Sequence, residues 1–386
     1  MKKKLSLVLA TLMLLGLLAG CGGQPAASGD KDTVVVYIGD IFNSMTPYMT
    51  TANSDQAVFD QVYETLTVTK DDGTVAPCLA KSWKMSDDSL EYTFQLEEGV
   101  KFHNGEVMTA DDVVYSFEQY IANPAKNNFV SMIDKVEMVD ANTVKVTLNK
   151  VTPLFLVYIN ELPILNKKFV EEHNGNISDV ACGTGPYKLT SIDLATSAML
   201  ERNDDYRLAP AAIEKVELRY VGDRSTASVQ LETGDLDIMS IDPSQLVSFE
   251  NNDKFTVEKV QTLKTALLAI NTTVAPLDNK LVRQAMTYAV DKQSIITIAY
   301  ENCAVPARLQ ANDTNCFGVD FSDATDFSYN PEKAKEELEL AKKELTDVSW
   351  PIVLDLLTDD ASASLPKQAA SLEQSIEESL GSENVD

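Results

Sequence analysis

Side chains that could carry catalytic or metal chemistry are few in this chain and lie far apart. Its 386 residues include two histidines, His103 and His173, and five cysteines. The sequence contains neither a G-x-S-x-G nucleophile motif nor an H-E-x-x-H zinc motif, and no cysteine pairs convincingly with a histidine. Because two distant histidines make no ligand cluster, we predict a protein that is not an enzyme and carries no metal or cofactor. His103, in a Phe-His-Asn-Gly turn, is interpreted as structural.

The first cysteine, Cys21, follows a segment typical of protein export. Lysines at positions 2–4 precede an apolar run at 5–18, which is too short and wrongly flanked for a permanent membrane anchor. The sequence Leu-Ala-Gly-Cys at 18–21 resembles the bacterial lipobox, which implies cleavage before Cys21 and a lipid on its thiol. We therefore expect a protein held at the outer face of the cell membrane, on the extracellular or periplasmic side. The alternative is an ordinary secretory signal in which Cys21 is incidental.

The other four cysteines permit one disulfide. Cys303 and Cys316 lie in a single loop containing Pro, Asn and Asp, and a bond is allowed outside the cytoplasm. Closing a loop of this size would stabilise the fold by roughly 3 kcal/mol. The pair is a candidate, and unpaired thiols are the alternative. Cys78 and Cys182 are expected to be small buried residues.

Composition narrows the function classes. The chain has 59 acidic and 32 basic residues, a formal net charge of −27. Such acidity opposes nucleic-acid binding, which needs clustered lysine and arginine, and otherwise indicates a well-solvated surface. An apolar content of 44% is typical of globular proteins, and this length favours two or three lobes. We expect a monomer.

The most informative stretch for local structure runs from residue 90 to residue 117. Residues 90–96 alternate between apolar and polar side chains, which predicts a half-buried strand. Asn104-Gly105 is a strong signal for a tight hairpin turn, because both residues accept positive φ. Thr109 is the expected N-cap of the helix that follows. The helix face expected to be buried comprises Val113, Val114, Phe117, Tyr120 and Ile121.

Candidate ligand contacts follow the first strand of the expected mature chain. Residues 33–38 form a β-branched run that predicts a strand buried on both faces. In open α/β sheets, ligands collect beyond the carboxyl ends of strands. Asp40, Asn43 and Tyr48 lie in the loop beyond this end and are our candidate ligand-binding residues. The alternative is a plain surface loop.

The glycine-rich segment Gly183-Thr184-Gly185-Pro186-Tyr187 is a second candidate region. A lone Gly-x-Gly is weak support for phosphate binding, and the strand–helix context of a P-loop is missing. We interpret Gly183, Thr184, Gly185 and Tyr187 as residues that shape a crossing of the chain between lobes.

A hinge is expected in the second half of the chain. Residues 267–271 read as a buried strand, and Asn271 at its end is placed as a further ligand contact. A helix is expected from Asp278. Residues 365–380 form an amphipathic helix for which the sequence offers no obvious packing partner.

Several motifs together resemble one family. The segments APCLAKSW, GTGPYKL, LETGDLDI and AINTTVAPLDNKLVRQAMTYAVDKQSII occur with the stretch at 90–117 in an order similar to that of extracellular solute-binding proteins of the peptide/nickel ABC-transporter class. The resemblance implies an α/β fold of periplasmic-binding-protein type II, with two lobes and an extra small α+β domain. The implied division is 1–20 signal peptide, 21–32 lipidated tether, 33–50 and 180–268 lobe I, 51–179 small domain, and 269–386 an incomplete lobe II.

The resemblance also implies a function. Members of the class capture solutes by closing their lobes and deliver them to the permease subunits of an ABC transporter. We expect the ligands to be oligopeptides or dipeptides. The alternatives are nickel, a metallophore or another solute, or a role in peptide sensing. Members of the class continue beyond the position that corresponds to residue 386, so we also expect a truncated second lobe.

Overall fold

The computed structural model describes residues 32–70, 73–123, 125, 127–260, 265–307, 323–358 and 364–385. The chain forms two compact units, residues 1–240 and 241–386. The elements of the first unit are β1 (Thr33–Ile38), α2 (Asn53–Val62), β2 (Thr67–Thr69), β3 (Val75–Pro77), β4 (Ala80–Met85), β5 (Glu91–Leu96), α3 (Ala110–Ala122), α4 (Asn127–Val130), β6 (Ile133–Asp140), β7 (Thr143–Leu148), α5 (Phe155–Tyr158), η2 (Ile159–Glu161), α6 (Lys167–Glu172), β8 (Tyr187–Asp193), β9 (Ser197–Arg202), β10 (Lys215–Tyr220) and α7 (Arg224–Thr233).

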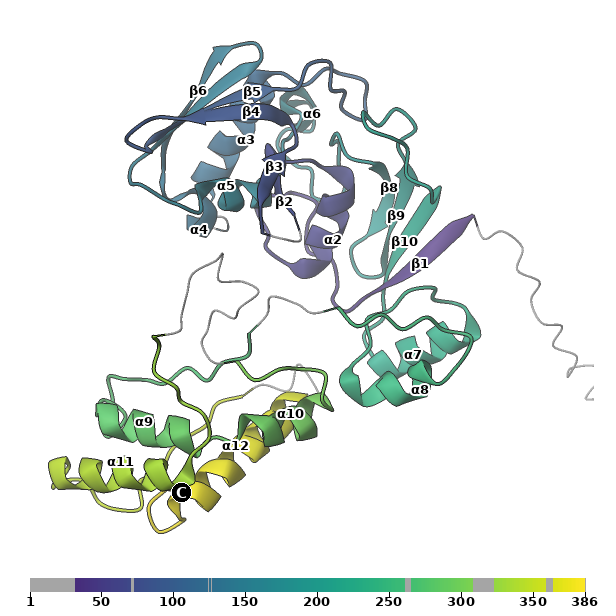
Figure 1. Cartoon of the computed structure of the whole chain (residues 1–386). Helices are drawn as coiled ribbons and strands as arrows, with labels where there is room; N and C mark the ends of the chain where they lie inside the picture. Colours follow the sequence, from purple (N-terminus) through teal and green to yellow (C-terminus); the bar gives the residue numbers. More distant parts are fainter. Residues whose placement is uncertain are drawn as a thin grey trace, which may run out of the picture. The chain divides into compact units, whose positions relative to one another are not determined.

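The first of the unit's two four-stranded sheets joins the start of the described chain to a distant segment. Its order is β1–β10–β9–β8, and β1 runs parallel to β10 with Thr33 opposite Lys215 (Figure 1). Helix α2 contacts β8. Residues from α7 form a small cluster with Val35 and Tyr37 of β1. The sheet therefore holds the carboxyl end of β1, from which the candidate loop departs, in a fixed place.

The second four-stranded sheet is antiparallel, in the order β4–β5–β7–β6, and α3 contacts β6 and β7. Strand β5 alternates as predicted, with Tyr92, Phe94 and Leu96 buried. The predicted turn at Asn104-Gly105 is confirmed, because Gly105 has φ +89° and Lys101 pairs with Val107. One continuous core packs against both sheets.

The start of α3 is capped as predicted. The backbone N–H of Thr109 donates to the Asp112 carboxylate at 2.9 Å, which satisfies a backbone donor at the helix start. Phe117 and Tyr120 are fully buried, but Ile121 is 44% exposed. The prediction that Ile121 faces the core is wrong, since it lies one position beyond the face that Phe117 and Tyr120 occupy.

Strand β1 is less buried than predicted. Val35 and Tyr37 are buried, while the other four residues of the strand are only half-buried. Beyond β1, on the side away from β10, the sheet ends in a single bridge between Val36 and Ile238. A strand near a sheet edge has fewer neighbours to cover both of its faces, which accounts for the difference.

The glycines at the chain crossing are required by a close approach of two backbones. A Cβ on Gly183 would lie 1.9 Å from the carbonyl oxygen of Val62, and one on Gly185 would lie 2.6 Å from that of Gln61. The N–H of Gly185 donates to the Val62 carbonyl at 2.9 Å. The Gly-x-Gly motif thus lets the segment before β8 lie directly against the end of α2.

The second unit is largely helical in its described part. Its elements are η3 (Pro243–Gln245), α8 (Leu246–Glu250), α9 (Lys280–Ala289), α10 (Lys292–Tyr300), α11 (Pro331–Glu344) and α12 (Ser364–Leu380). Helix α12 contacts α9, α10 and α11, so the amphipathic helix expected to lack a partner has three. The hydroxyls of Ser375 and Ser379 both donate to the Ala289 carbonyl at the end of α9.

The buried strand predicted at 267–271 is not present. The segment has no strand assignment, and Leu267 and Leu268 are 59% and 44% exposed. No strand among the described residues pairs with it. The helix expected from Asp278 begins at Lys280, with Asn279 as its N-cap. Within the described ranges, no helix is both long and apolar enough to cross a membrane.

Replacing Gly183 by alanine should destabilise the first unit. The new Cβ meets backbone atoms, which cannot rotate away, so we expect a loss of about 3 kcal/mol or more in chemical denaturation. Gly39→Ala is the control, because its Cβ would meet the Tyr37 side chain at an ordinary 3.4 Å. Equal unfolding midpoints for the two variants would contradict the close approach.

Candidate functional site

The loop between β1 and α2 forms one wall of a cavity in the first unit. The cavity has a volume of about 810 Å³, within the usual range for small-ligand sites. Its other wall comes from the turn after α6. The lining residues are Asn43, Ser44, Thr46, Met49, Thr50, Thr51, Ala52, Ala125, Asn174, Gly175, Asn176 and Ser178.

A buried carboxylate fixes the shape of the first wall. Asp55 in the first turn of α2 is 0% exposed and accepts hydrogen bonds from three donors of the loop. These are the backbone N–H of Asn43 at 2.8 Å, that of Ser44 at 3.4 Å and the hydroxyl of Thr50 at 2.7 Å. An acidic side chain is also favoured at this end of a helix. The loop is therefore held in a defined conformation.

The two walls are joined to each other at their base. The backbone N–H of Met45 donates to the Ser178 carbonyl at 2.8 Å, and the Tyr48 hydroxyl donates to the Gly175 carbonyl at 3.4 Å. Asn174 and Gly175 have φ values of +53° and +79°, which turn the return segment sharply. The cavity thus has two walls that the fold holds together.

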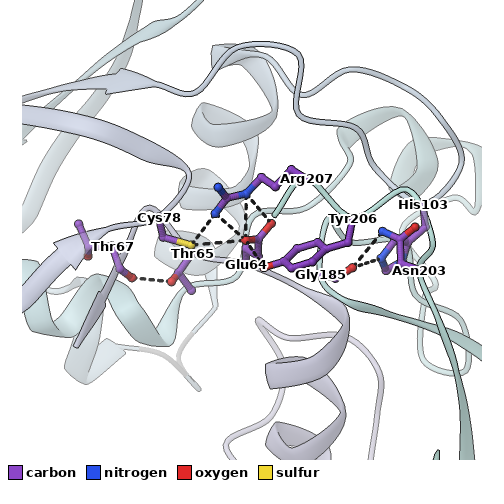
Figure 2. A network of polar contacts seen from close by, with 9 residues as sticks. All are labelled: Glu64, Thr65, Thr67, Cys78, His103, Gly185, Asn203, Tyr206 and Arg207. Carbon is purple, nitrogen blue, oxygen red and sulfur yellow. Dashed lines mark hydrogen bonds and ion pairs between the residues drawn. The ribbon is translucent and has the colours of Figure 1, made fainter. Parts of the chain in front are cut away.

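A polar network in the first unit ties segments together that lie far apart in the sequence (Figure 2). Glu64, with a side chain only 6% exposed, pairs with Arg207 at 2.8 Å and accepts from the Tyr206 hydroxyl at 3.1 Å. The thiol of Cys78 points at the same carboxylate at 3.6 Å. Removing one partner of such a buried pair would leave an uncompensated buried charge, which is strongly destabilising.

The second part of this network centres on the carbonyl of Gly185. His103 donates to it from Nε2 at 3.0 Å, and Asn203 donates from its side-chain amide at 3.1 Å. The backbone N–H of His103 also donates to the Gly183 carbonyl at 2.8 Å. The hairpin at 100–108 is thereby clamped to the glycine crossing, which agrees with a structural role for His103.

The family described as bacterial extracellular solute-binding proteins, family 5 Middle, matches residues 74–381, most of the chain. The chain belongs to this family. Its fold class is the predicted α/β type II periplasmic-binding-protein fold, which the solved structures below share.

Curated relatives of this solute-binding protein bind different ligands. It is 29% identical over 380 residues to heme-binding protein A of Haemophilus influenzae, covering 88% of this chain and 68% of that protein. It is 29% identical over 341 residues to the glutathione-binding protein GsiB of Pectobacterium atrosepticum, covering 86% of this chain and 65% of that protein. It is 30% identical over 312 residues to the nickel-binding periplasmic protein of Escherichia coli, covering 77% of this chain and 58% of that protein. The chain spans 58% to 68% of the length of these relatives.

Solved structures agree with this assignment. NikZ from Campylobacter jejuni, in complex with Ni(L-His), superposes with a TM-score of 0.76 at 26% identity, covering 93% of this chain and 74% of that one. DppA from Helicobacter pylori, associated with an ABC transporter and in complex with the peptide STSA, gives 0.75 at 26%, covering 92% and 73%. CtaP from Listeria monocytogenes superposes with a TM-score of 0.76 at 27% identity, covering 92% of this chain and 72% of that one.

The predicted ligand-binding residues occupy different environments in this solute-binding protein. Asn43 lines the cavity, and Asp40 is exposed earlier in the same loop. Tyr48 is 5% exposed, packs edge-on against Tyr120 and is not among the residues that line the cavity. Asn271 belongs to the second unit, where its Oδ1 accepts from the N–H and hydroxyl of Thr273.

The predicted crossing and cysteine residues are placed as follows. Thr184 is 2% exposed, and Tyr187 is buried at the start of β8 with its hydroxyl donating to the Ile213 carbonyl at 3.0 Å. Cys182 is buried and Cys78 half-buried, while Cys303 is exposed. Cys21 and Cys316 lie outside the described residues, so lipidation and the Cys303–Cys316 bond stay predictions.

The sequence did not single out most of the cavity lining. Residues 173–178 have the sequence His-Asn-Gly-Asn-Ile-Ser, which indicates a turn but does not indicate what the turn packs against. Asp55 was not a candidate either, although it organises the first wall. Among the described residues, no group of three His, Cys, Asp or Glu side chains is arranged to hold a metal ion.

The clamp histidine should make stability depend on pH. Burial lowers the pKa of His103 to about 4, from an ordinary value of 6.5. The contribution of His103 to the free energy of unfolding is complete above pH 6.5 and is lost as the pH falls toward 4. Between these two pH values the imidazole takes up a proton in the unfolded chain but not in the folded one. We expect about 3 kcal/mol of this dependence in denaturant titrations, and His103→Gln should remove it. Identical pH profiles for the variant and the wild type would contradict this.

Proposed function

We propose that this chain is a lipid-anchored receptor that captures oligopeptides or dipeptides outside the membrane and delivers them to the permease of an ABC transporter. The observation that carries the proposal is a cavity lined by hydrogen-bonding side chains in a chain of the family 5 solute-binding proteins. Peptides present amide donors and acceptors along their length, which suits such a lining. Capture by lobe closure is part of the proposal, because a ligand that contacts both lobes favours the closed form.

Peptide ligands are supported by one of the similar structures. DppA from Helicobacter pylori holds a peptide and is associated with an ABC transporter. We infer a receptor and not an enzyme, because the similar curated proteins are named for the ligands that they bind. A nickel complex is the second candidate, favoured by the likeness to NikZ with Ni(L-His) and to the nickel-binding periplasmic protein. Titration with both kinds of ligand separates these candidates.

Attachment through Cys21 is the second part of the proposal. It is supported by the Leu-Ala-Gly-Cys sequence that follows a basic and apolar leader. We expect the wild-type protein in a bacterial host to incorporate labelled palmitate and to sediment with membranes. Cys21→Ser should abolish both, because the thiol that carries the lipid is missing. Equal labelling of the variant would contradict lipidation at this position.

Peptide capture predicts a ligand-dependent rise in the melting temperature of the purified protein, because ligand bound to the folded state stabilises it. Asp40→Ala should leave the melting temperature without ligand unchanged, since Asp40 is exposed. If Asp40 contacts the peptide, we expect about three- to tenfold weaker binding.

The matched control for this experiment is Asp134→Ala. Asp134 is also exposed, on β6 of the second sheet, and does not line the cavity. It should bind peptide like the wild type. Unchanged affinity of Asp40→Ala would remove Asp40 from the site, and a thermal shift with Ni(L-His) but with no peptide would overturn peptide capture.

A further inference from the structure

Met49 differs from the other exposed methionines of the described chain because it lines the cavity. Among the methionines that the structure describes, three have exposed side chains: Met49 at 61%, Met85 at 53% and Met138 at 56%. Single exposed apolar side chains are common on protein surfaces. Met85 and Met138 are of this kind, since they lie on β4 and β6 of the second sheet and are not among the described lining residues. Met49 instead belongs to the loop between β1 and α2 that forms one wall.

The fold fixes the backbone of Met49 and leaves its side chain exposed. The backbone N–H of Met49 donates to the Thr46 carbonyl at 3.0 Å. Tyr48, which precedes it, is 5% exposed. Thr50, which follows it, is 9% exposed, and its hydroxyl donates to the Asp55 carboxylate at 2.7 Å. The Met49 side chain thus starts from a fixed place in the wall, and most of its surface is open to a ligand.

A thioether at this place is suited to contact apolar groups of a ligand. Methionine is unbranched and polarisable, so it adapts its shape to different apolar partners. Ala52 and Ala125 add smaller apolar groups to the same lining. When a ligand covers such side chains, apolar surface leaves water, which favours binding. The cavity therefore offers an adaptable apolar contact beside its hydrogen-bonding groups.

Exposure also makes the sulfur of Met49 accessible to oxidants. A methionine thioether reacts with a peroxide to give a sulfoxide, which is polar and chiral. In this step the sulfur donates an electron pair to one oxygen of hydrogen peroxide, so an S–O bond forms as the O–O bond breaks. The departing hydroxide takes the proton from the transferred oxygen and leaves as water. The sulfur loses two electrons, and the peroxide gains them.

We propose, on the basis of the proposed function, that Met49 is an oxidation-sensitive ligand contact. In its reduced form, Met49 packs against apolar side chains of a bound peptide. Oxidation by hydrogen peroxide replaces this apolar surface with a polar sulfoxide, and covering a polar group with an apolar one disfavours binding. The oxidised protein therefore binds such peptides more weakly. Its fold is unchanged, because the Met49 side chain lies outside the buried core.

The experiment treats the full chain with hydrogen peroxide and titrates it with the peptide Ala-Leu-Leu-Ala by calorimetry, beside untreated protein. Mass spectrometry of proteolytic fragments measures sulfoxide at each methionine. We expect sulfoxide at Met49, Met85 and Met138, and about three- to tenfold weaker binding by the treated wild type, because an apolar contact is lost. Met45 is 0% exposed and should stay reduced, and the melting temperature without peptide should be unchanged.

Three variants separate the effect of Met49 from that of the other exposed methionines. Met49→Leu keeps an apolar side chain of similar size, so it should bind like the wild type and retain its affinity after peroxide treatment. The double variant Met85→Leu/Met138→Leu should lose affinity on treatment as the wild type does. Met49→Gln carries a polar group at the same place and should bind like the oxidised wild type without treatment.

The opposite results are equally definite. If the treated wild type carries sulfoxide at Met49 and binds like the untreated protein, the inference is overturned while peptide capture stands. An equal loss of affinity by treated Met49→Leu overturns the inference alone, as does a Met49 that stays reduced when Met85 and Met138 have reacted. If the untreated wild type does not bind the peptide, the proposed function and this inference fail together.

Discussion

The carboxylate of Asp55 is fully buried, and three donors from the loop after β1 converge on its two oxygens. A buried carboxylate without such donors would cost several kcal/mol, so this conformation of the loop stabilises the start of α2. This contact fixes one wall of the cavity. The bond from Met45 to Ser178 then positions the opposite wall. At the other end of α2, the contact of Gly183 and Gly185 with residues 61 and 62 fixes the helix against the crossing.

Local signals in the sequence predicted the local structure well. The alternation at 90–96, the Asn104-Gly105 turn and the Thr109 cap depend on neighbours only a few residues away, and the structure contains each of them. Gly183 and Gly185 lie in close approach to the end of α2, while their role in a crossing between lobes stays a prediction. Family membership could also be predicted from the sequence, since it depends on short motifs in a particular order.

Contacts between distant residues were not accessible from the sequence. Glu64 and Arg207 lie 143 positions apart, and neither has a local pattern that identifies the other as its partner. The partners of α12 and the exposure of Leu267 likewise depend on how segments pack, since an apolar run reads the same whether or not it finds a partner strand. Only one wall of the cavity contained a predicted site residue, which is Asn43. Nothing in the sequence of the turn at 174–178 indicated that this turn lines a cavity. Relatives that share the fold bind heme, glutathione or nickel, so ligand identity depends on side chains at the site and not on the fold.

The central claim is that the loop held by Asp55 forms part of the peptide site. The most direct measurement is a calorimetric titration of tetra-alanine into Asp55→Asn and wild-type protein, with melting curves of both. The substitution keeps the size of the side chain but turns an N–H group toward the loop donors, so we expect cooperative unfolding with about tenfold or greater loss of affinity. Wild-type affinity in a variant that unfolds cooperatively would contradict the account.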